Sequence, residues 1–354
     1  MGKRILGGVL GAGLLASGCA AAADGGAATV DGAPFAHLAQ CGDAPYVAVF
    51  RGFTREGLAT EGPGSSPSSD VYGIRPDGSV GRITTDLGTY EFGITADAST
   101  LINSPRVRST GPGRDDVFDE VLRLDLASGR RTQLLAGPPV LEAVPSPDGT
   151  RVALVAPEEG IAPGVPVMAD LALLDARMPN GLARQQTGAS LGKRDLVWSP
   201  DGRSLAYVAD LPEFGAEARI RDMATGEERV VHSPDADGGS LISLDWSVDG
   251  ARLLTLRSDF DPEVEDVTSV LLEIDLGQNT TLPVLDAATP GSVYSSADAS
   301  AITALDNRQD EPLTARTWTR APDGTFALAS TAEFGSDEGL VGADLLSIPD
   351  CAMR

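Results

Sequence analysis

Histidine and cysteine are scarce in this chain, and their scarcity limits its chemistry. The 354 residues include two histidines, His37 and His232, and three cysteines. Neither histidine has a visible serine and aspartate partner for a catalytic triad, and the sequence has no G-x-S-x-G nucleophile motif. No cysteine and histidine cluster has the spacing of a zinc site. We therefore predict no catalytic residue and no cofactor, which favours a non-enzymatic protein over an enzyme.

Basic residues are also few. Lys and Arg number 27 against 51 Asp and Glu, so the formal net charge is −24. Because binding to nucleic acid phosphates needs a basic surface, nucleic acid is excluded as a partner. Direct adhesion to anionic lipid headgroups is disfavoured for the same reason.

The apolar run at residues 5–15 is shorter than the roughly 20 residues that cross a bilayer, so we do not expect it to be a transmembrane helix.

The amino terminus has the layout of an export signal. Lys3 and Arg4 precede the apolar run, and the small residues 16–18 precede Cys19. This segment resembles the lipobox of bacterial lipoproteins, in which the cysteine receives a diacylglyceryl group. The resemblance implies a signal peptide over residues 1–18 and a lipid anchor on Cys19. It places the protein on the outer face of the cell membrane, or on a periplasm-facing outer membrane where the cell has one. The alternative is an ordinary secretory signal with Cys19 incidental.

Residues 19–45 are rich in Gly and Ala and lack hydrophobic periodicity, so we expect a flexible tether. Beyond it the chain is repetitive. Five related segments place an aspartate in a tight turn between two strand-like runs, at Asp97, Asp148, Asp201, Asp249 and Asp298. Each is followed by a second pair of strand-like runs. Four antiparallel strands recurring about every 50 residues are typical of a β-propeller blade.

Residues 198–207, WSPDGRSLAY, resemble the TolB-type, WD40-like propeller repeat almost letter for letter. The resemblance implies a propeller fold and a binding or scaffold role at the cell envelope. The aspartates could invite a catalytic interpretation. However, Pro, Asp and Gly each suit one corner of a tight turn, so we assign them a structural role. The pairs with this predicted role are Asp148 and Gly149, Asp201 and Gly202, and Asp249 and Gly250.

Counting the repeats predicts an all-β, six-bladed propeller of four-stranded antiparallel blades over residues 46–354. Five units are complete, and a partial one over residues 46–84 lacks its innermost strand. Residues 339–348 have the pattern of a strand and are left over at the other end. We therefore expect a closing blade that mixes strands from both termini, in a protein that is monomeric.

The two remaining cysteines flank that closing blade. Cys41 precedes its first strand from the amino-terminal side, and Cys351 follows the strand from the carboxyl-terminal side. Export permits disulfide formation. We predict a Cys41–Cys351 disulfide that closes the ring, the alternative being two free buried thiols.

Loop length separates the two faces of the predicted disc. One face has only tight turns, whereas the other has the long connections between the second and third strands of each blade, where binding residues are usually found. One such segment, residues 257–266, is rich in carboxylates. Asp259, Asp261 and Glu263 are candidate calcium ligands, although the segment lacks the pattern of an EF-hand and a solvated acidic loop explains it better. We predict no metal site on this basis.

These observations predict a cell-envelope lipoprotein that binds a protein partner or ligand through its long-loop face and does not act as an enzyme. The partner would be another envelope protein, and the lipid anchor would hold the chain at the membrane. A calcium-dependent hydrolase or lactonase acting in the propeller funnel is the first alternative. A sensor-associated lipoprotein that modulates a membrane partner is the second.

Overall fold

A computed structural model of the chain gives an all-β architecture, and its described residues contain β-strands, turns and no helix. Every described strand pairing is antiparallel. The structure describes residues 48–54, 69–75, 79–84, 90–95, 99–104, 107–109, 116–126, 128–157, 169–178, 182–185, 192–211, 215–233, 240–247, 249–261, 266–287, 293–295, 301–306, 313–322, 324–333 and 340–347.

The described strands form six sheets, which we number in chain order. Sheet 1 contains β25 (Leu340–Ser347), β1 (Ala48–Thr54), β2 (Ser69–Ile74) and β3 (Val80–Arg82). Sheet 2 contains β4 (Tyr90–Ile94), β5 (Thr100–Ser104), β6 (Val107–Ser109), β7 (Asp116–Asp125) and β8 (Arg131–Val140). Sheet 3 contains β9 (Glu142–Pro145), β10 (Arg151–Pro157), β11 (Ala169–Asp175) and β12 (Leu182–Gln185).

The other three sheets follow the same simple order. Sheet 4 contains β13 (Lys193–Trp198), β14 (Ser204–Leu211), β15 (Gly215–Asp222) and β16 (Glu228–His232). Sheet 5 contains β17 (Ser240–Trp246), β18 (Arg252–Asp261), β19 (Asp266–Asp275) and β20 (Thr280–Ala287). Sheet 6 contains β21 (Val293–Ser295), β22 (Ala301–Asp306), β23 (Thr314–Arg320) and β24 (Phe326–Glu333).

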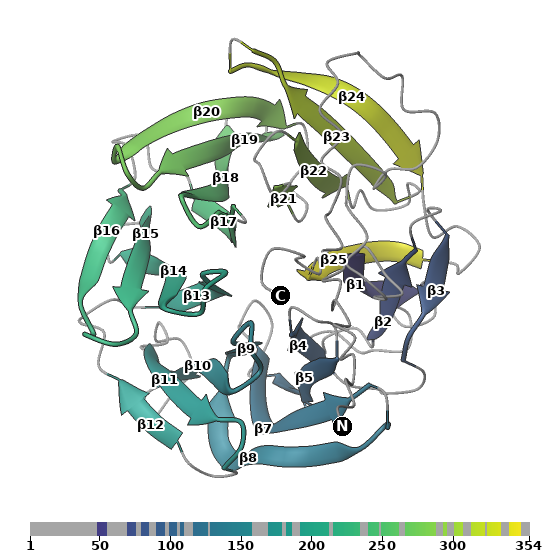
Figure 1. The fold of residues 1–354 in the computed structure, drawn as a ribbon, viewed down its shortest axis with the longest axis vertical. Helices are drawn as coiled ribbons and strands as arrows, with labels where there is room; N and C mark the ends of the chain where they lie inside the picture. The colour runs from purple at the N-terminus through teal and green to yellow at the C-terminus, as the bar shows by residue number, and fades with distance from the viewer. Residues whose placement is uncertain are drawn as a thin grey trace, which may run out of the picture.

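The sheets are arranged radially around a common centre (Figure 1). Strands β25, β4, β9, β13, β17 and β21 lie nearest the centre, and the later strands of each sheet lie towards the rim. The first and last described strands meet in sheet 1, where β25 pairs with β1. Residues 339–348, expected to supply the strand missing from the first unit, contain β25.

The hydrophobic core lies between neighbouring sheets, and the sequence of β14 shows why. Residues 205–209 are all buried, because both faces of the strand are covered. Leu205 and Tyr207 pack towards sheet 3, whereas Ala206 and Val208 pack towards sheet 5. Side chains alternate across a strand, so a run that is apolar at every position supplies two cores at once.

Two segments differ from the sequence expectation. Sheet 2 has five strands instead of four, because β6 lies within residues 106–116, which were expected to form a loop. The cause is the length of β7: only Leu122–Asp125 pair with β5, and β6 pairs with Asp116–Phe118 on the same edge. Residues 257–266 were also expected to form a loop. There β18 continues to Asp261 and β19 begins at Asp266, so the segment is largely a long hairpin.

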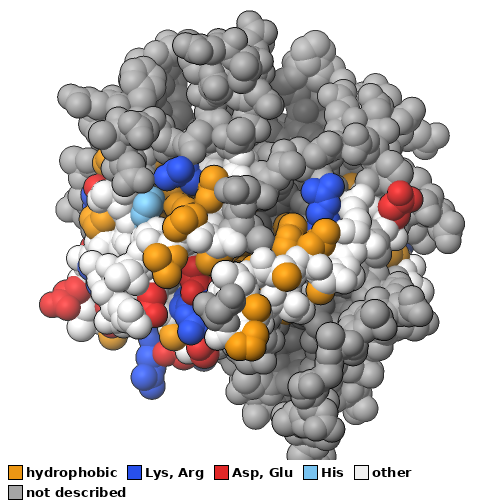
Figure 2. Space-filling view, turned by 90° about the horizontal axis from the view of Figure 1, so that it is seen from above, with side chains coloured by type: hydrophobic (Ala, Val, Ile, Leu, Met, Phe, Trp, Pro, Cys, Tyr) orange, Lys and Arg blue, Asp and Glu red, His pale blue; other side chains and the backbone are white. Residues whose placement is uncertain are grey.

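The described residues include no helix long and apolar enough to span a membrane. The predicted signal peptide, the tether, and the three cysteines Cys19, Cys41 and Cys351 lie outside the described residues. Figure 2 views the rim of the disc from the side of β20 and β24, where the described hydrophobic side chains are interspersed with charged ones. The outermost strands β16, β20 and β24 each expose one large hydrophobic residue, respectively Val230, Leu282 and Leu328.

Candidate functional site

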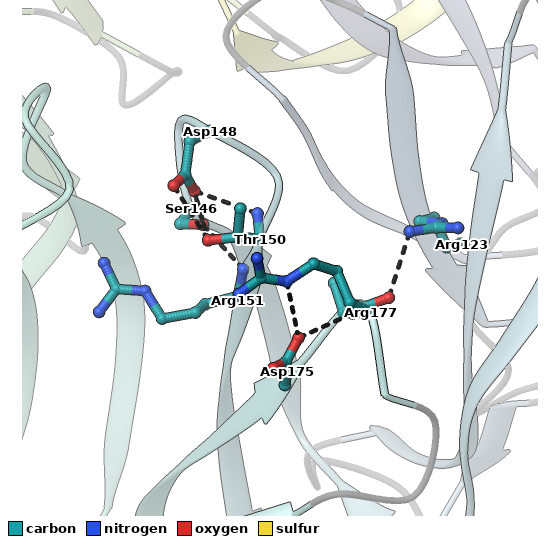
Figure 3. Close-up of polar contacts among 8 residues, drawn as sticks. Arg123, Ser146, Asp148, Thr150, Arg151, Asp175 and Arg177 are labelled. Carbon is teal, nitrogen blue, oxygen red and sulfur yellow. Dashed lines mark hydrogen bonds and ion pairs between the residues drawn. The ribbon is translucent and has the colours of Figure 1, made fainter.

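The repeat aspartates are engaged in the turns that join the first two strands of sheets 3, 4 and 5. In the first of these turns the Ser146 hydroxyl donates a 2.7 Å hydrogen bond to Asp148, and the Thr150 backbone N–H donates another of 3.0 Å (Figure 3). Asp201 accepts the same two bonds from Ser199 and Arg203. Asp249 accepts them from Ser247 and Ala251. The glycine that follows each aspartate has a positive φ, of 66°, 66° and 68° for Gly149, Gly202 and Gly250.

These hydrogen bonds also determine the charge of the turn carboxylates. Partial burial alone would raise the pKa of Asp148, but the bonds from Ser146 and Thr150 outweigh it and lower that pKa. The pKa values of Asp201 and Asp249 are lowered by the equivalent serine and backbone donors, again against an opposing effect of burial. All three carboxylates are therefore ionised at neutral pH. Each carboxylate accepts hydrogen bonds from within its own turn.

Neighbouring sheets are joined by hydrogen bonds between their innermost strands. The indole N–H of Trp198 in sheet 4 donates to the Val144 carbonyl of sheet 3, at 3.0 Å. The indole N–H of Trp246 in sheet 5 makes the equivalent bond, 3.2 Å long, to the Val197 carbonyl of sheet 4. Each tryptophan lies three residues before the turn aspartate of its own repeat. The same repeat position therefore supplies the indole donor in both sheets.

A charged cluster lies at the opposite end of the same innermost strands, away from the aspartate turns. It comprises Glu142 of β9, Arg194 and Asp195 of β13, and Asp210 of β14. The Arg194 guanidinium forms an ion pair with Asp195, lies 3.4 Å from Asp210, and donates a 2.7 Å hydrogen bond to the Leu241 carbonyl of sheet 5. Arg194 therefore connects sheet 4 to sheet 5.

Glu142 makes the matching connection between sheets 3 and 4. Its carboxylate accepts a 2.9 Å hydrogen bond from the Leu196 backbone N–H. Enclosure in the protein, reinforced by the negative charge of Asp195, raises the pKa of Glu142 to about 8. Burial also raises the pKa of Asp195, against the opposing effect of Arg194. Two neighbouring carboxylates with raised pKa values make this cluster sensitive to pH.

Strand irregularities shape the cluster. The pairing of β13 with β14 shifts register between Arg194 and Val197, and Asp195 has a φ of 54°. Sheet 5 has the same combination of a positive φ and a register shift. Ser243 has a φ of 59°, and the pairing of β17 with β18 shifts register between Ile242 and Leu244. Such a bulge re-aims the side chains around it. The Ser243 backbone N–H stabilises the ionised form of Asp195 by hydrogen bonding, which adds a second link from sheet 4 to sheet 5.

Sequence reasoning missed this cluster although a signal was present. Glu142 and Asp195 each lie six residues before the turn aspartate of their repeats, and Glu91 occupies the same place before Asp97. Lys193 was also missed. It is buried, and its ammonium donates a 2.6 Å hydrogen bond to the Ala169 carbonyl of sheet 3.

A groove of about 890 Å³ opens between sheets 4 and 5 beside the aspartate turns. Its apolar lining residues are Pro200, Ile220, Trp246 and Leu276. Its polar lining residues are Ser199, Asp201, Ser204, Asp222, Glu227, Glu228, Arg229 and Asp249, and Gly250 also lines it. The groove therefore lies on the face that the sequence predicted to have only tight turns.

The calcium candidates are only partly described. The backbones of Asp259 and Asp261 pair with Thr268 and Asp266 in the β18–β19 hairpin, and Glu263 lies outside the described residues. Within the described part of the chain, no three His, Cys, Asp or Glu side chains are grouped so that they could hold a metal ion. The hydrolase alternative, which would use the loop side of the ring, stays a prediction.

Comparison with known proteins identifies the fold. No family model and no curated protein sequence matches the chain. Among solved structures it is similar to TolB from Acinetobacter baumannii, with a TM-score of 0.57 and 13% identity over 86% of this chain and 67% of that one. It is similar to a putative TolB from Agrobacterium tumefaciens, with a TM-score of 0.51 and 15% identity over 86% and 94% of the two chains.

A manganese complex of an oligogalacturonate lyase is also similar, with a TM-score of 0.52 and 16% identity over 79% of this chain and 77% of that one. The chain therefore has a TolB-like propeller fold. Identities this low show the fold alone, and these neighbours include both TolB proteins and an enzyme.

Proposed function

We propose that this chain is a non-enzymatic binding scaffold of the bacterial cell envelope, anchored by a lipid on Cys19. In this proposal the six sheets are the six blades of a closed propeller, with sheet 1 as the closing blade. A disulfide between Cys41 and Cys351 secures the closure. An envelope protein binds at the end of the ring where the charged cluster lies.

Binding at this end is supported by the hydrogen bonds that fix the charged cluster to the backbones of neighbouring sheets. Glu142 bonds to the backbone of sheet 4, and Arg194 bonds to the backbone of sheet 5. The cluster thus spans three neighbouring sheets through hydrogen bonds that cross between them. A rigid scaffold that presents polar groups of both signs suits specific recognition, because little conformational entropy is lost on binding. The predicted export signal supports the envelope location, and the TolB-like fold is compatible with it.

Binding at the cluster end is tested by capture from crosslinked envelopes. Asp210 is the variant of choice, because its side chain is 39% exposed and replacing it leaves the Arg194 bond to sheet 5 in place. We expect Asp210→Asn to lose a partner that the unmodified chain captures and that excess untagged protein displaces. Asp175→Asn, at the end of β11 on the opposite face, is the matched control, because its side chain is 34% exposed and lies outside the charged cluster; this variant should keep the partner. A partner captured equally by both variants contradicts binding at this end.

The anchor is tested separately. Cells supplied with an alkyne fatty acid should label the intact chain and leave a Cys19→Ala variant unlabelled. Equal labelling of the two would refute the lipid anchor while leaving the binding proposal in place.

A further inference from the structure

The outermost strand of sheet 6 differs from the outermost strands of the other five sheets. Strand β24 spans eight residues, pairs with β23 along one edge, and pairs with no other described strand. It has no proline, and its one charged residue is Glu333 at its end. Residues 326–332 therefore form an uncharged strand edge along the rim of the disc (Figure 1).

Each of the other outermost strands has a feature that discourages pairing with another chain. Strands β3 and β12 have only three and four residues. Strand β16 begins with Glu228 and Arg229. Strand β20 contains Pro283, and β8 contains Pro138 and Pro139. Short length, charge and proline are the usual means by which a sheet protects its edge.

The bulge in β24 does not make up for the absence of these features. Leu328 pairs with Trp318 and Ser330 pairs with Thr317, so Ala329 is an extra residue in the outer strand. Strands β16 and β20 have comparable register shifts against their own neighbours and carry charge or proline in addition. Strand β24 has the bulge alone.

The side chains of β24 leave its edge open. Ala327, Leu328, Ala329 and Thr331 are exposed, and the exposed fraction of Leu328 is 57%. Since alanine has almost no side chain, its exposure means that the backbone around it is also accessible. In the turn before the strand, a Cβ built on Gly324 would meet no described atom within 4 Å.

Contacts on the inner side hold the strand in place. The guanidinium carbon of Arg320 in β23 lies 4.5 Å from the ring centroid of Phe326, the first residue of β24. Arg320 also forms an ion pair with Glu273 of sheet 5. The edge is thus fixed before any partner is present, which reduces the entropy lost on pairing.

We propose that β24 pairs with the β24 of a second copy of this chain, antiparallel and about a two-fold axis. Every described strand pair is antiparallel, and two-fold symmetry is the commonest symmetry of homodimers. Because residues 326–332 carry no charge, any two-fold register within this segment places uncharged residues opposite each other. A charged segment of another protein would gain no ion pair along this edge. The uncharged strand of a second copy matches it.

The net charge of −24 makes two copies repel each other over most of their surfaces. An uncharged edge is therefore the place where they can approach. The proposal replaces the monomer expected from the sequence with a dimer formed rim to rim. It does not depend on the function proposed above, because the charged cluster lies on the innermost strands.

Sedimentation equilibrium of the full chain tests the association, and hydrogen exchange locates it. One pair of strands buries less than the roughly 1,200 Å² of a standard interface, so we expect a weak dimer with a dissociation constant of about 0.1–1 mM. Backbone amides of residues 326–332 should gain protection as the average mass rises. Raising the salt concentration from about 0.05 to 0.5 M should strengthen the association at least about threefold, because it screens the repulsion.

Two lysine variants separate strand pairing from a general effect of charge. Leu328→Lys places a charge within the uncharged segment and should weaken the association at least about tenfold. Leu282→Lys on β20 makes the same change of charge at a position that is 58% exposed, and it should not weaken the association. Equal melting temperatures of the two variants establish that both are folded.

Three results would each overturn the proposal. The first is an average mass that stays at the monomer value up to about 1 mM protein at high salt. The second is equal association of Leu328→Lys and Leu282→Lys. The third is an association that leaves the exchange of residues 326–332 unchanged, since the interface would then lie elsewhere.

Discussion

Glu142 in the innermost strand of sheet 3 accepts a hydrogen bond from the backbone N–H of Leu196 in the innermost strand of sheet 4. The bond is 2.9 Å long and crosses from one sheet to the next. The Glu142 carboxyl group has a pKa of about 8, against 4.5 for an ordinary glutamate, because it is enclosed by the protein and lies near Asp195. One junction between sheets is therefore linked to a group that titrates near neutral pH.

The first prediction concerns pH. Between the ordinary pKa and about 8 the folded chain holds a proton on Glu142 that the unfolded chain releases. The stabilisation is fully present below about pH 4.5 and is lost as the pH rises through 8. Glu142→Gln cannot titrate, so it should remove this part of the pH dependence. We expect the difference in unfolding free energy between variant and unmodified chain to change by on the order of 2 kcal/mol from pH 5 to 9, allowing for partial solvent access.

Urea unfolding at several pH values measures this change. Leu328→Gln, at an exposed position of β24 without a titrating group, is the control and should show a constant difference from the unmodified chain. A constant difference for Glu142→Gln as well would mean that Glu142 does not titrate in this range.

The second prediction concerns the indole links between sheets. Trp198→Phe removes the donor to the Val144 carbonyl, and Trp246→Phe removes the donor to the Val197 carbonyl. Each leaves a carbonyl without this bond at a junction of sheets, so we expect each to lower the unfolding free energy by about 1–3 kcal/mol. Trp318→Phe in sheet 6 is the control. Equal urea midpoints for all three variants would show that the two indole bonds add nothing to stability.

The third prediction compares equivalent turn glycines. Gly149 and Gly250 have φ values of 66° and 68°, so alanine at either position is strained by about 1–2 kcal/mol. A Cβ on Gly149 would also lie 3.0 Å from Thr95 Cγ2, whereas the nearest described atom to one on Gly250 is at 3.9 Å. Thermal unfolding should therefore show a larger loss for Gly149→Ala than for Gly250→Ala. The reverse order would mean that the crowding at Thr95 is relieved at no cost.

The sequence predicted what repeats along the chain and missed what depends on contacts across it. The turn aspartates, their glycines and the strand pattern recur about every 50 residues, so the propeller fold follows from local chemistry. The bond partner of Glu142 lies 54 residues away in another sheet, and no local pattern specifies that contact. Strand β6 was missed because it forms only where β7 extends beyond β5.

The fourth prediction concerns the closure of sheet 1. Strand β1 begins at Ala48, strand β25 ends at Ser347, and Val49 pairs with Ser347 across the two strands. Cys41 lies seven residues before β1 and Cys351 four residues after β25. The pairing therefore brings the start of β1 and the end of β25 to the same end of sheet 1, which supports the proposed disulfide.

A bond that closes a loop of about 300 residues should stabilise the fold by several kcal/mol in the chain-entropy model. The unreduced chain should migrate faster than the reduced chain on a denaturing gel, and reduction should lower its melting temperature. The double variant Cys41→Ser and Cys351→Ser should show neither difference, whereas Cys19→Ala should keep both. If reduction leaves mobility and melting temperature unchanged in the unmodified chain, the two cysteines are free thiols. The closure of sheet 1 would then depend on the pairing of β25 with β1 alone.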